Sequence, residues 1–196
     1  MGRRLIKFDY PEGATPLEPE ELYDLIPVHI ATQEQLNAWE QKNIVLAENW
    51  ARFKKNIVSV DFIQQLHKHM FGETWKWAGK FRRSGKNIGI DWHTISSQLK
   101  LLLDDIKYQL FHKSYEINEI AARFYHRLVF IHPFANGNGR HARLVTDRFL
   151  ISQNCSQFSW GQKNLYNPSL TRKQYIEALK SADKGNYQLL LQFVRE

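Results

Sequence analysis

Apolar residues recur every three or four positions through most of the chain after Thr32, which is the period of an amphipathic α-helix. The stripes before residue 152 are Leu36, Trp39, Leu46, Trp50 and Phe53; Ile63, Leu66 and Met70; Leu99, Leu102, Leu103, Ile106 and Leu110; Ile117, Ile120, Ala121, Phe124, Leu128 and Ile131; and Ala142, Val145, Phe149 and Leu150. The helix that carries the fourth stripe has few polar residues, so we expect it to be central in the domain. The pattern predicts a mainly α-helical domain.

Capping residues suggest where several of these helices begin and end. Thr32 with Gln35, and Thr171 with Gln174, form capping boxes, in which each side chain satisfies a free backbone N–H of the other residue. A further helix is expected over 59–72, from a serine to a glycine, and a glycine at 185 separates the last two helices.

Two segments depart from the helical pattern. Residues 1–31 are rich in proline and acidic residues and are predicted to form an irregular arm on the domain surface. Residues 75–90 interleave aromatic and β-branched side chains with glycines and basic residues, so a short β-hairpin is expected around Ser84 and Gly85.

Composition narrows the classes of protein. The 196 residues are enough for one domain, and 13% aromatic residues argue against general disorder. No apolar run is long enough to span a membrane, and the basic N-terminal residues lead into no apolar segment of the kind a secretory signal needs. A single cysteine, Cys155, excludes an internal disulfide and a cysteine-based zinc cluster, and it fits a cytoplasmic location. The net charge of +7 favours an anionic partner: nucleic acid, an acidic protein face or a polyphosphate.

The candidate chemistry lies at 132–143, in the sequence HPFANGNGRHAR between the fourth and fifth predicted helices. Gly137 and Gly139 flank Asn138 and let successive backbone N–H groups converge on an anion. The helix that begins there adds its own free N–H groups and the positive end of its dipole. Arg140 and Arg143 share one helical face and suit polyphosphate oxygens.

His132 is the group in this loop that can take up a proton near neutral pH. Beside a phosphate site it can deprotonate an incoming hydroxyl, which contributes on the order of 10²–10⁴ in rate. Phe134 is expected to lie buried beneath the loop and to fix the direction of the imidazole.

This stretch resembles the signature of the Fic family, H-x-F-x-[DE]-G-N-G-R-x-x-R, at every specified position but one. The match, together with its helical surroundings, looks like a Fic core over 56–196, preceded by a candidate inhibitory helix at 32–55 and the arm at 1–31. The sequence WAGKFR at 77–82 and the short length are most similar to the small bacterial Fic proteins called mobile mystery protein B. The fold implied is a Fic-type helical bundle with a short β-hairpin flap.

The resemblance implies transfer of AMP from ATP to a hydroxyl of a target protein. It implies these roles: His132 as general base, Phe134 as structural anchor, Gly137, Asn138 and Gly139 on the α-phosphate, Arg140 on the β-phosphate and Arg143 on the γ-phosphate. The flap that aligns the target by strand addition would comprise Arg83, Ser84, Gly85, Lys86, Asn87 and Ile88.

The one departure is Asn136, which stands where the family has an acidic residue that holds Mg²⁺. A neutral amide can coordinate the ion through oxygen but adds no charge, so weaker Mg²⁺ binding is expected. Many Fic proteins also carry an inhibitory Glu that pairs with the second motif arginine. Glu40 is the candidate for that role here, and Glu48 is the alternative.

Several alternatives remain open at this point. The chain can be a Fic relative that transfers phosphate or another phosphodiester-linked group, a catalytically silent nucleotide-binding module, or a DNA-binding regulator suggested by charge alone. Arg143 can pair with Asp147 one helical turn later instead of binding phosphate. His67 and His69 face different directions on a helix, so no zinc site is expected there. The sequence predicts neither the oligomeric state nor the target.

Overall fold

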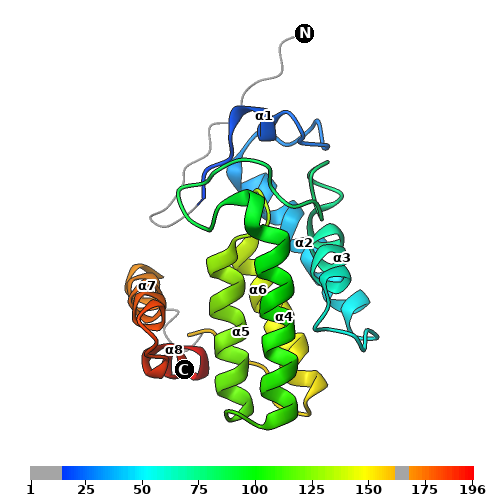
Figure 1. Cartoon of the computed structure of the whole chain (residues 1–196). Coiled ribbons are helices and arrows are strands. Elements are labelled where there is room, and N and C mark those ends of the chain that lie inside the picture. Colours follow the sequence, from blue (N-terminus) through cyan, green and yellow to red (C-terminus); the bar gives the residue numbers. More distant parts are fainter. Residues whose placement is uncertain (1–14, 162–167) are drawn as a thin grey trace.

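The computed structural model describes residues 15–161 and 168–196. At its centre, α4 (Ile95–His112) and α5 (Ile117–Ile131) run antiparallel and side by side, with α6 (Asn138–Ser152) packed along α5 (Figure 1). The 3₁₀ turn η1 (Trp92–Thr94) leads directly into α4. The expectation that the fourth predicted helix is central is confirmed, because α5 contacts α4, α6 and α8.

Two helix pairs flank this centre. On one side, α2 (Gln33–Ala51) packs on α3 (Val60–Phe71), and α3 contacts both α4 and α6. On the other side, α7 (Pro168–Asp183) packs on α8 (Gln188–Arg195). The short α1 (Pro19–Leu22) lies above the upper end of the bundle in Figure 1.

Side-chain caps explain the starts of α2 and α3. Ser59 accepts a hydrogen bond from the Phe62 N–H at 3.2 Å, and Gly72 follows the last residue of α3, as expected. Thr32 caps α2 by accepting from the Gln35 N–H at 3.3 Å, but the Gln35 side chain accepts from the Ala31 N–H, so this box is not reciprocal. The box expected at Thr171 is wrong. The helix already begins at Pro168, whose fixed φ suits a first helical residue, so Thr171 lies inside α7.

The apolar stripe expected along α2 is wrong in part. The helix buries Leu36, Ala47 and Ala51, while Leu46 and Phe53 are exposed. Two polar side chains, Glu40 and Asn43, complete its buried face. The spacing of apolar residues therefore did not predict which face of α2 is buried, because that face also carries hydrogen-bonding side chains.

The hairpin expected around Ser84 and Gly85 is wrong. In the described part of the chain the sole β-type pairing is an isolated antiparallel bridge between Leu25 and Trp75, and residues 83–90 form an irregular loop. A buried guanidinium, that of Arg82, binds the backbone carbonyls of this loop at Ser84 and Ile90. The loop thus gains from one side chain the hydrogen bonds that a paired strand would have supplied.

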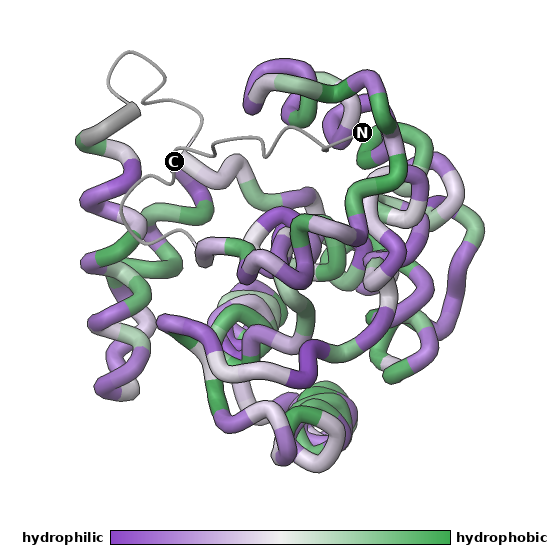
Figure 2. The backbone as a smooth tube through the Cα atoms, turned by 90° about the horizontal axis from the view of Figure 1, so that it is seen from above, coloured by the Kyte–Doolittle hydropathy of each residue, from purple (hydrophilic) through white to green (hydrophobic). Residues whose placement is uncertain are grey.

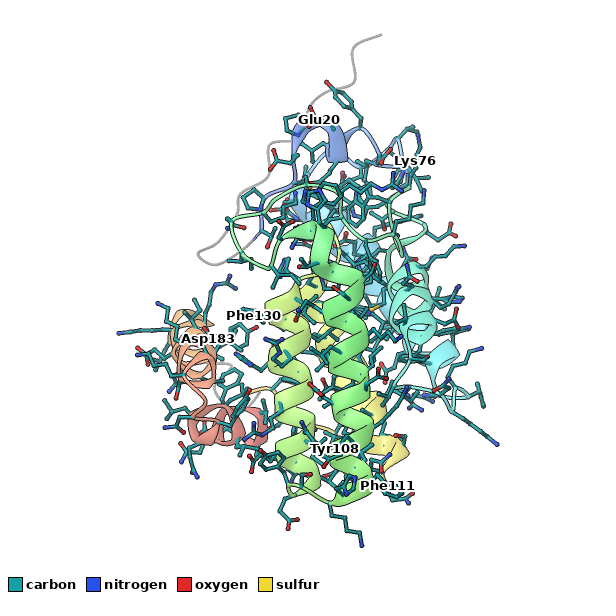
Figure 3. The ribbon with its side chains drawn as sticks, viewed as in Figure 1. Glu20, Lys76, Tyr108, Phe111, Phe130 and Asp183 are labelled. Carbon is teal, nitrogen blue, oxygen red and sulfur yellow. The ribbon has the colours of Figure 1, made fainter. Side chains whose placement is uncertain are left out.

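One continuous hydrophobic cluster runs through the described residues from Ile30 to Val194. Apolar and polar segments alternate along the helices when the bundle is seen from above (Figure 2). The α7–α8 pair is also joined to the centre by a polar contact, because His126 Nε2 on α5 lies 2.8 Å from Asp183 Oδ1 on α7. Asp183 and Phe130 of α5 lie on the sides of their helices that face one another (Figure 3). None of the helices in the described residues is both long and apolar enough to cross a membrane.

Candidate active site

The loop at 132–137 joins α5 to α6 at the end of the bundle nearest α1. His132 ends α5 in the left-handed conformation, with φ of 54°, and its N–H still bonds to the Leu128 carbonyl. The side chain is almost completely covered, with 5% of the residue exposed.

The hydrogen bonds of His132 define its tautomer. Nδ1 lies 3.2 Å from the Val129 carbonyl oxygen, which can only accept, so Nδ1 carries the proton. Nε2 is therefore an acceptor, and it lies 2.9 Å from the Thr15 hydroxyl, which donates to it. Burial lowers the pKa of His132 to about 4, and the nearby charges of Arg82 and Lys86 act in the same direction. The imidazole is consequently neutral at pH 7, and the lone pair on Nε2 accepts from the Thr15 hydroxyl.

Phe134 lies under the loop, fully buried, and stacks on His67 of α3 with ring centroids 3.7 Å apart. His67 accepts from the Gly79 N–H at Nδ1 and donates from Nε2 to the Asn136 carbonyl, both at 3.0 Å. Burial holds the pKa of His67 well below its usual value, so the ring stays neutral and this arrangement persists. A neutral histidine thus supports the loop from beneath.

Asn138 acts through its side chain inside the loop. Its Oδ1 accepts from the Phe134 N–H at 2.9 Å and its Nδ2 donates to the Phe134 carbonyl at 2.8 Å. Gly137, with φ of +77°, precedes α6 and lies so close to Phe71 that a Cβ would approach the ring to 2.6 Å. Both residues therefore fix the path of the loop, and Asn138 has only its backbone left to offer an anion.

The start of α6 has the features of an anion site. The first intrahelical bond runs from the His141 N–H to the Gly137 carbonyl, and the N–H groups of the preceding turn have no acceptor within the helix. A Cβ added at Gly139 would meet nothing within 4 Å. This open space beside unpaired donors and the positive end of the helix suits a phosphate group.

The two arginines of the motif lie in different surroundings. Arg140 donates to Glu40 Oε2 at 2.7 Å, and Glu40 Oε1 accepts from the Trp75 indole at 2.8 Å. Arg143 is enclosed by aromatic rings, with its guanidinium 5.6 Å from the ring centroids of both Trp160 and Tyr175.

The resemblance implied that an inhibitory glutamate would pair with Arg143, but Glu40 pairs with Arg140, the first arginine of the motif. Burial is the largest single influence on the pKa of the Arg143 guanidinium and lowers it, but Tyr125, Tyr175 and Asp147 together outweigh burial and the pKa is raised. The pairing of Arg143 with Asp147 that the spacing allowed is not formed as a close ion pair, since Asp147 accepts from the Trp160 indole at 3.1 and 3.0 Å.

Asn136 uses both ends of its amide. Nδ2 donates to the Thr15 carbonyl at 2.9 Å, and Oδ1 accepts from the Gly137 N–H at 2.7 Å. In the described residues no group of three or more His, Cys, Asp or Glu side chains could hold a metal ion. A Mg²⁺ at this loop would find one neutral amide oxygen, Asn136 Oδ1, which already accepts from the Gly137 N–H.

Arg82 connects the irregular loop to the imidazole. It donates to the carbonyls of His132 at 2.7 Å, Ser84 at 2.7 Å and Ile90 at 2.5 Å. Gly89, with φ of +99°, lies so close that a Cβ there would approach the His132 Cβ to 2.6 Å. The predicted flap residues thus lie beside the imidazole, although without the predicted strands.

Lys86 is the flap residue with the most specific contacts. Its ammonium group bonds to Glu21 Oε2 at 2.5 Å and to the Pro16 carbonyl at 3.3 Å, and its side chain is 1% exposed. Arg83, Gly85, Asn87 and Ile88 are exposed, and Ser84 is half-buried.

Sequence reasoning missed three residues of this site. Thr15 lies in the irregular arm, 117 positions from its histidine partner, and no local signal indicated the contact. His67 was considered only as a metal ligand, and Arg82 only as part of the sequence WAGKFR at 77–82. The one sequence feature that could have indicated the role of Arg82 is its position next to a glycine-rich loop. The backbone groups of such a loop need hydrogen-bond partners from outside the loop.

Residues 57–150, which contain this whole loop, match the model of the Fic/DOC family. The chain carries a Fic/DOC family domain. Curated relatives agree: it is 27% identical over 154 residues to a protein adenylyltransferase Fic of Drosophila mojavensis, covering 76% of this chain and 29% of the relative. A protein of the same name from Nematostella vectensis is 27% identical over 149 residues, covering 72% and 32%. The chain thus spans less than a third of the length of these relatives.

Solved structures share the fold. Fic-1 of C. elegans, residues 134–508, superposes with a TM-score of 0.65 at 23% identity, over 83% of this chain and 48% of that chain. The BepC protein of Bartonella tribocorum, solved with bound AMPPNP, gives a TM-score of 0.64 at 18% identity, over 85% and 87%. The similarity to the Fic fold therefore extends well beyond the motif, into the flanking helices.

Proposed function

We propose that this Fic domain is a protein adenylyltransferase, which transfers AMP from ATP to a hydroxyl side chain of a protein. The observation that carries the proposal is a neutral imidazole, His132, with its lone pair on a hydroxyl group, next to an open helix N-terminus. A general base and an anion site in one loop are what transfer of a phosphoryl-type group to an alcohol requires. The name of the curated relatives supports AMP as the transferred group.

In this mechanism His132 Nε2 accepts the proton of the acceptor hydroxyl as its oxygen attacks the α-phosphorus. The bond between the α-phosphorus and the oxygen that bridges to the β-phosphate breaks, and pyrophosphate leaves. The backbone N–H groups at the start of α6 stabilise the charge that develops on the phosphate oxygens, helped by the dipole of the helix. Val129 contributes by keeping the proton on Nδ1, so that Nε2 remains the basic atom.

Arg140 and Arg143 are proposed to bind the β- and γ-phosphates. Arg140 is 41% exposed at its side chain and can turn from Glu40 to a phosphate. A guanidinium prefers bidentate contact with such oxyanions. The loop at 132–137 has no carboxylate, so a Mg²⁺ that accompanies the triphosphate would be held mainly by the phosphates, with Asn136 as the one amide ligand that the motif offers.

Glu40 is proposed to restrain the activity. It occupies the guanidinium of Arg140 from inside the molecule, 4% exposed and held in place by the Trp75 indole. A phosphate and this carboxylate cannot both make the same close contact, so nucleotide binding must break an ion pair that already exists. Through this ion pair the segment at 32–55 would act as an inhibitory helix on the core at 56–196. We propose this division of the chain.

The loop at 83–90 is proposed to receive the target protein. Arg82 and Gly89 place this loop beside His132, and Arg83, Gly85 and Ile88 are exposed on its surface. Without paired strands in the loop, target recognition would depend on single backbone and side-chain contacts more than on strand addition.

The test uses ATP labelled with ³²P at the α-phosphate, with a cell extract as the source of targets. We expect label to pass to protein with the wild-type chain and not with His132→Ala, while both bind a non-hydrolysable ATP analogue equally. Labelling that persists in His132→Ala contradicts the proposal. Parallel reactions with γ-labelled ATP distinguish the rival chemistry, because a phosphotransferase would transfer that label instead.

A further inference from the structure

The contact between Thr15 and His132 is the starting point of a further inference. The Thr15 hydroxyl lies 2.9 Å from Nε2, the atom that the proposed mechanism uses as the base. Thr15 is 8% exposed, so this is an enclosed contact and not a chance encounter at the surface. The hydroxyl occupies the position that the acceptor alcohol of a target must take.

The backbone around Thr15 is held as a bound peptide would be. Asn136 Nδ2 donates to the Thr15 carbonyl at 2.9 Å, and Lys86 Nζ donates to the next carbonyl, that of Pro16, at 3.3 Å. One of these donors belongs to the phosphate loop and the other to the proposed target-binding loop. Neither contact reads a side chain, so the same two groups can hold any peptide that crosses the site in this direction.

Further contacts keep the segment after Thr15 in place. Lys86 pairs with Glu21, the Trp77 indole donates to the Glu21 carbonyl at 3.3 Å, and the Ile26 N–H donates to the Thr74 carbonyl at 2.9 Å. The arm from residue 15 to residue 26 therefore crosses the active site as an ordered strap. Because these contacts are intramolecular, Thr15 is presented to His132 at a high effective concentration.

We propose that Thr15 is an intramolecular acceptor of the transferred group, so that the protein modifies itself at this hydroxyl. This proposal rests on the proposed function. The Thr15 Oγ1–phosphorus bond forms, the bond between the α-phosphorus and the pyrophosphate oxygen breaks, and pyrophosphate leaves. The hydroxyl proton passes to His132 Nε2 and from there to solvent, so the net change is a threonine ester of AMP, pyrophosphate and one proton.

The same geometry has a consequence for other substrates. One lone pair on Nε2 can accept one hydroxyl, so Thr15 and a target hydroxyl exclude each other. Addition of a bulky, charged AMP group at Thr15 would also force the strap out of its 8% exposed position. Self-modification would therefore clear the site for a target protein.

The experiment is peptide mapping by mass spectrometry after the full chain is incubated with ATP and Mg²⁺, in the wild-type and Glu40→Gly backgrounds. We expect an AMP adduct on Thr15 that is absent from Thr15→Val and present in Thr15→Ser. Tyr23→Phe, which removes another hydroxyl from the same arm, is the matched control and should keep the adduct. The initial rate per molecule should not change with protein concentration, as expected for a reaction within one chain.

Circular dichroism and binding of the ATP analogue are used to check that Thr15→Val is folded. A His132-dependent adduct on other residues, unchanged in Thr15→Val, overturns the assignment of Thr15 and leaves the proposed function standing. The lack of any adduct in both backgrounds also overturns it, and the labelling of extract proteins then decides the proposed function separately. Labelling that survives His132→Ala defeats both proposals.

Discussion

Replacement of Glu40 by glutamine tests whether the internal carboxylate competes with a nucleotide. The glutamine side chain would retain an oxygen to accept from the Trp75 indole, now at 2.8 Å from Oε1, and would fill the same volume. It would lose the 2.7 Å contact to Arg140, because an amide nitrogen cannot accept from a guanidinium. The substitution therefore changes one interaction and leaves the packing of α2 intact.

The size of the effect follows from the contact. A hydrogen bond to a charged group contributes about 1.5–3 kcal/mol, and a nucleotide no longer has to replace it. At about 1.4 kcal/mol for each factor of ten, the affinity for an ATP analogue should rise roughly 10- to 100-fold. Arg140 is 41% exposed at its side chain and remains solvated, so we expect a loss of only about 1 kcal/mol in the free energy of unfolding.

Isothermal titration calorimetry with a non-hydrolysable ATP analogue measures the affinity, and urea denaturation measures the stability. Glu48→Gln is the matched control. It removes a carboxylate from the same helix at a point near Asp147 and Arg148, away from the start of α6. Equal affinities for wild type, Glu40→Gln and Glu48→Gln would refute the competition. Glu40→Gly should likewise raise self-modification, although glycine in a helix costs about 1 kcal/mol more than alanine.

Three further predictions concern the loop and its support. Arg82→Met should lower the unfolding free energy by about 2–4 kcal/mol in urea denaturation, because carbonyls that Arg82 now binds at 2.5 to 2.7 Å lose their donor. Gly137→Ala should abolish labelling and cost about 1–3 kcal/mol, since a Cβ would lie 2.6 Å from the Phe71 ring at a φ of +77°. Burial lowers the pKa of His67 well below its usual value and that of His141 to about 3, so both must stay neutral in the native state. Stability should be fully present above pH 6.5 and fall by up to about 1.4 kcal/mol per histidine for each pH unit below it, because the unfolded chain takes up protons that the native chain excludes.

A different result would contradict each of these three predictions. Arg83→Met, at an exposed neighbour, is the control for Arg82, and equal losses in both variants would show that the carbonyl contacts contribute little. Normal labelling by Gly137→Ala would show that Phe71 yields to a methyl group. Unfolding free energies that are the same at pH 7 and pH 5 would contradict the buried neutral histidines.

Much of the helical architecture was predictable because several of the helices have a local signal. The apolar period of α5 and the serine and glycine that bound α3 can be recognised within a few residues of sequence. The loop at 132–137 was predictable for the same reason, since glycines, a histidine and basic residues occur together there. Local sequence therefore specifies the elements and the site that joins two of them.

The remainder depended on contacts between distant residues. The burial of Glu40 results from Trp75 and Arg140, 35 and 100 positions away, and it changed part of the face that α2 was expected to bury. The hairpin failed because Arg82 satisfies carbonyls that a strand pairing would otherwise have used. Periodicity reports how often apolar residues recur, but it does not report which polar groups find partners across the fold.

The contacts of Arg82 have a mechanical consequence. One guanidinium holds both the backbone of the proposed base and the two ends of the neighbouring loop. A protein that docks on this loop and shifts it must also pull on the His132 carbonyl, and so alter the tilt of the imidazole. The orientation of the His132 imidazole would then depend on how the target protein docks. A protein that binds in the wrong pose would leave the base misoriented and would not be modified.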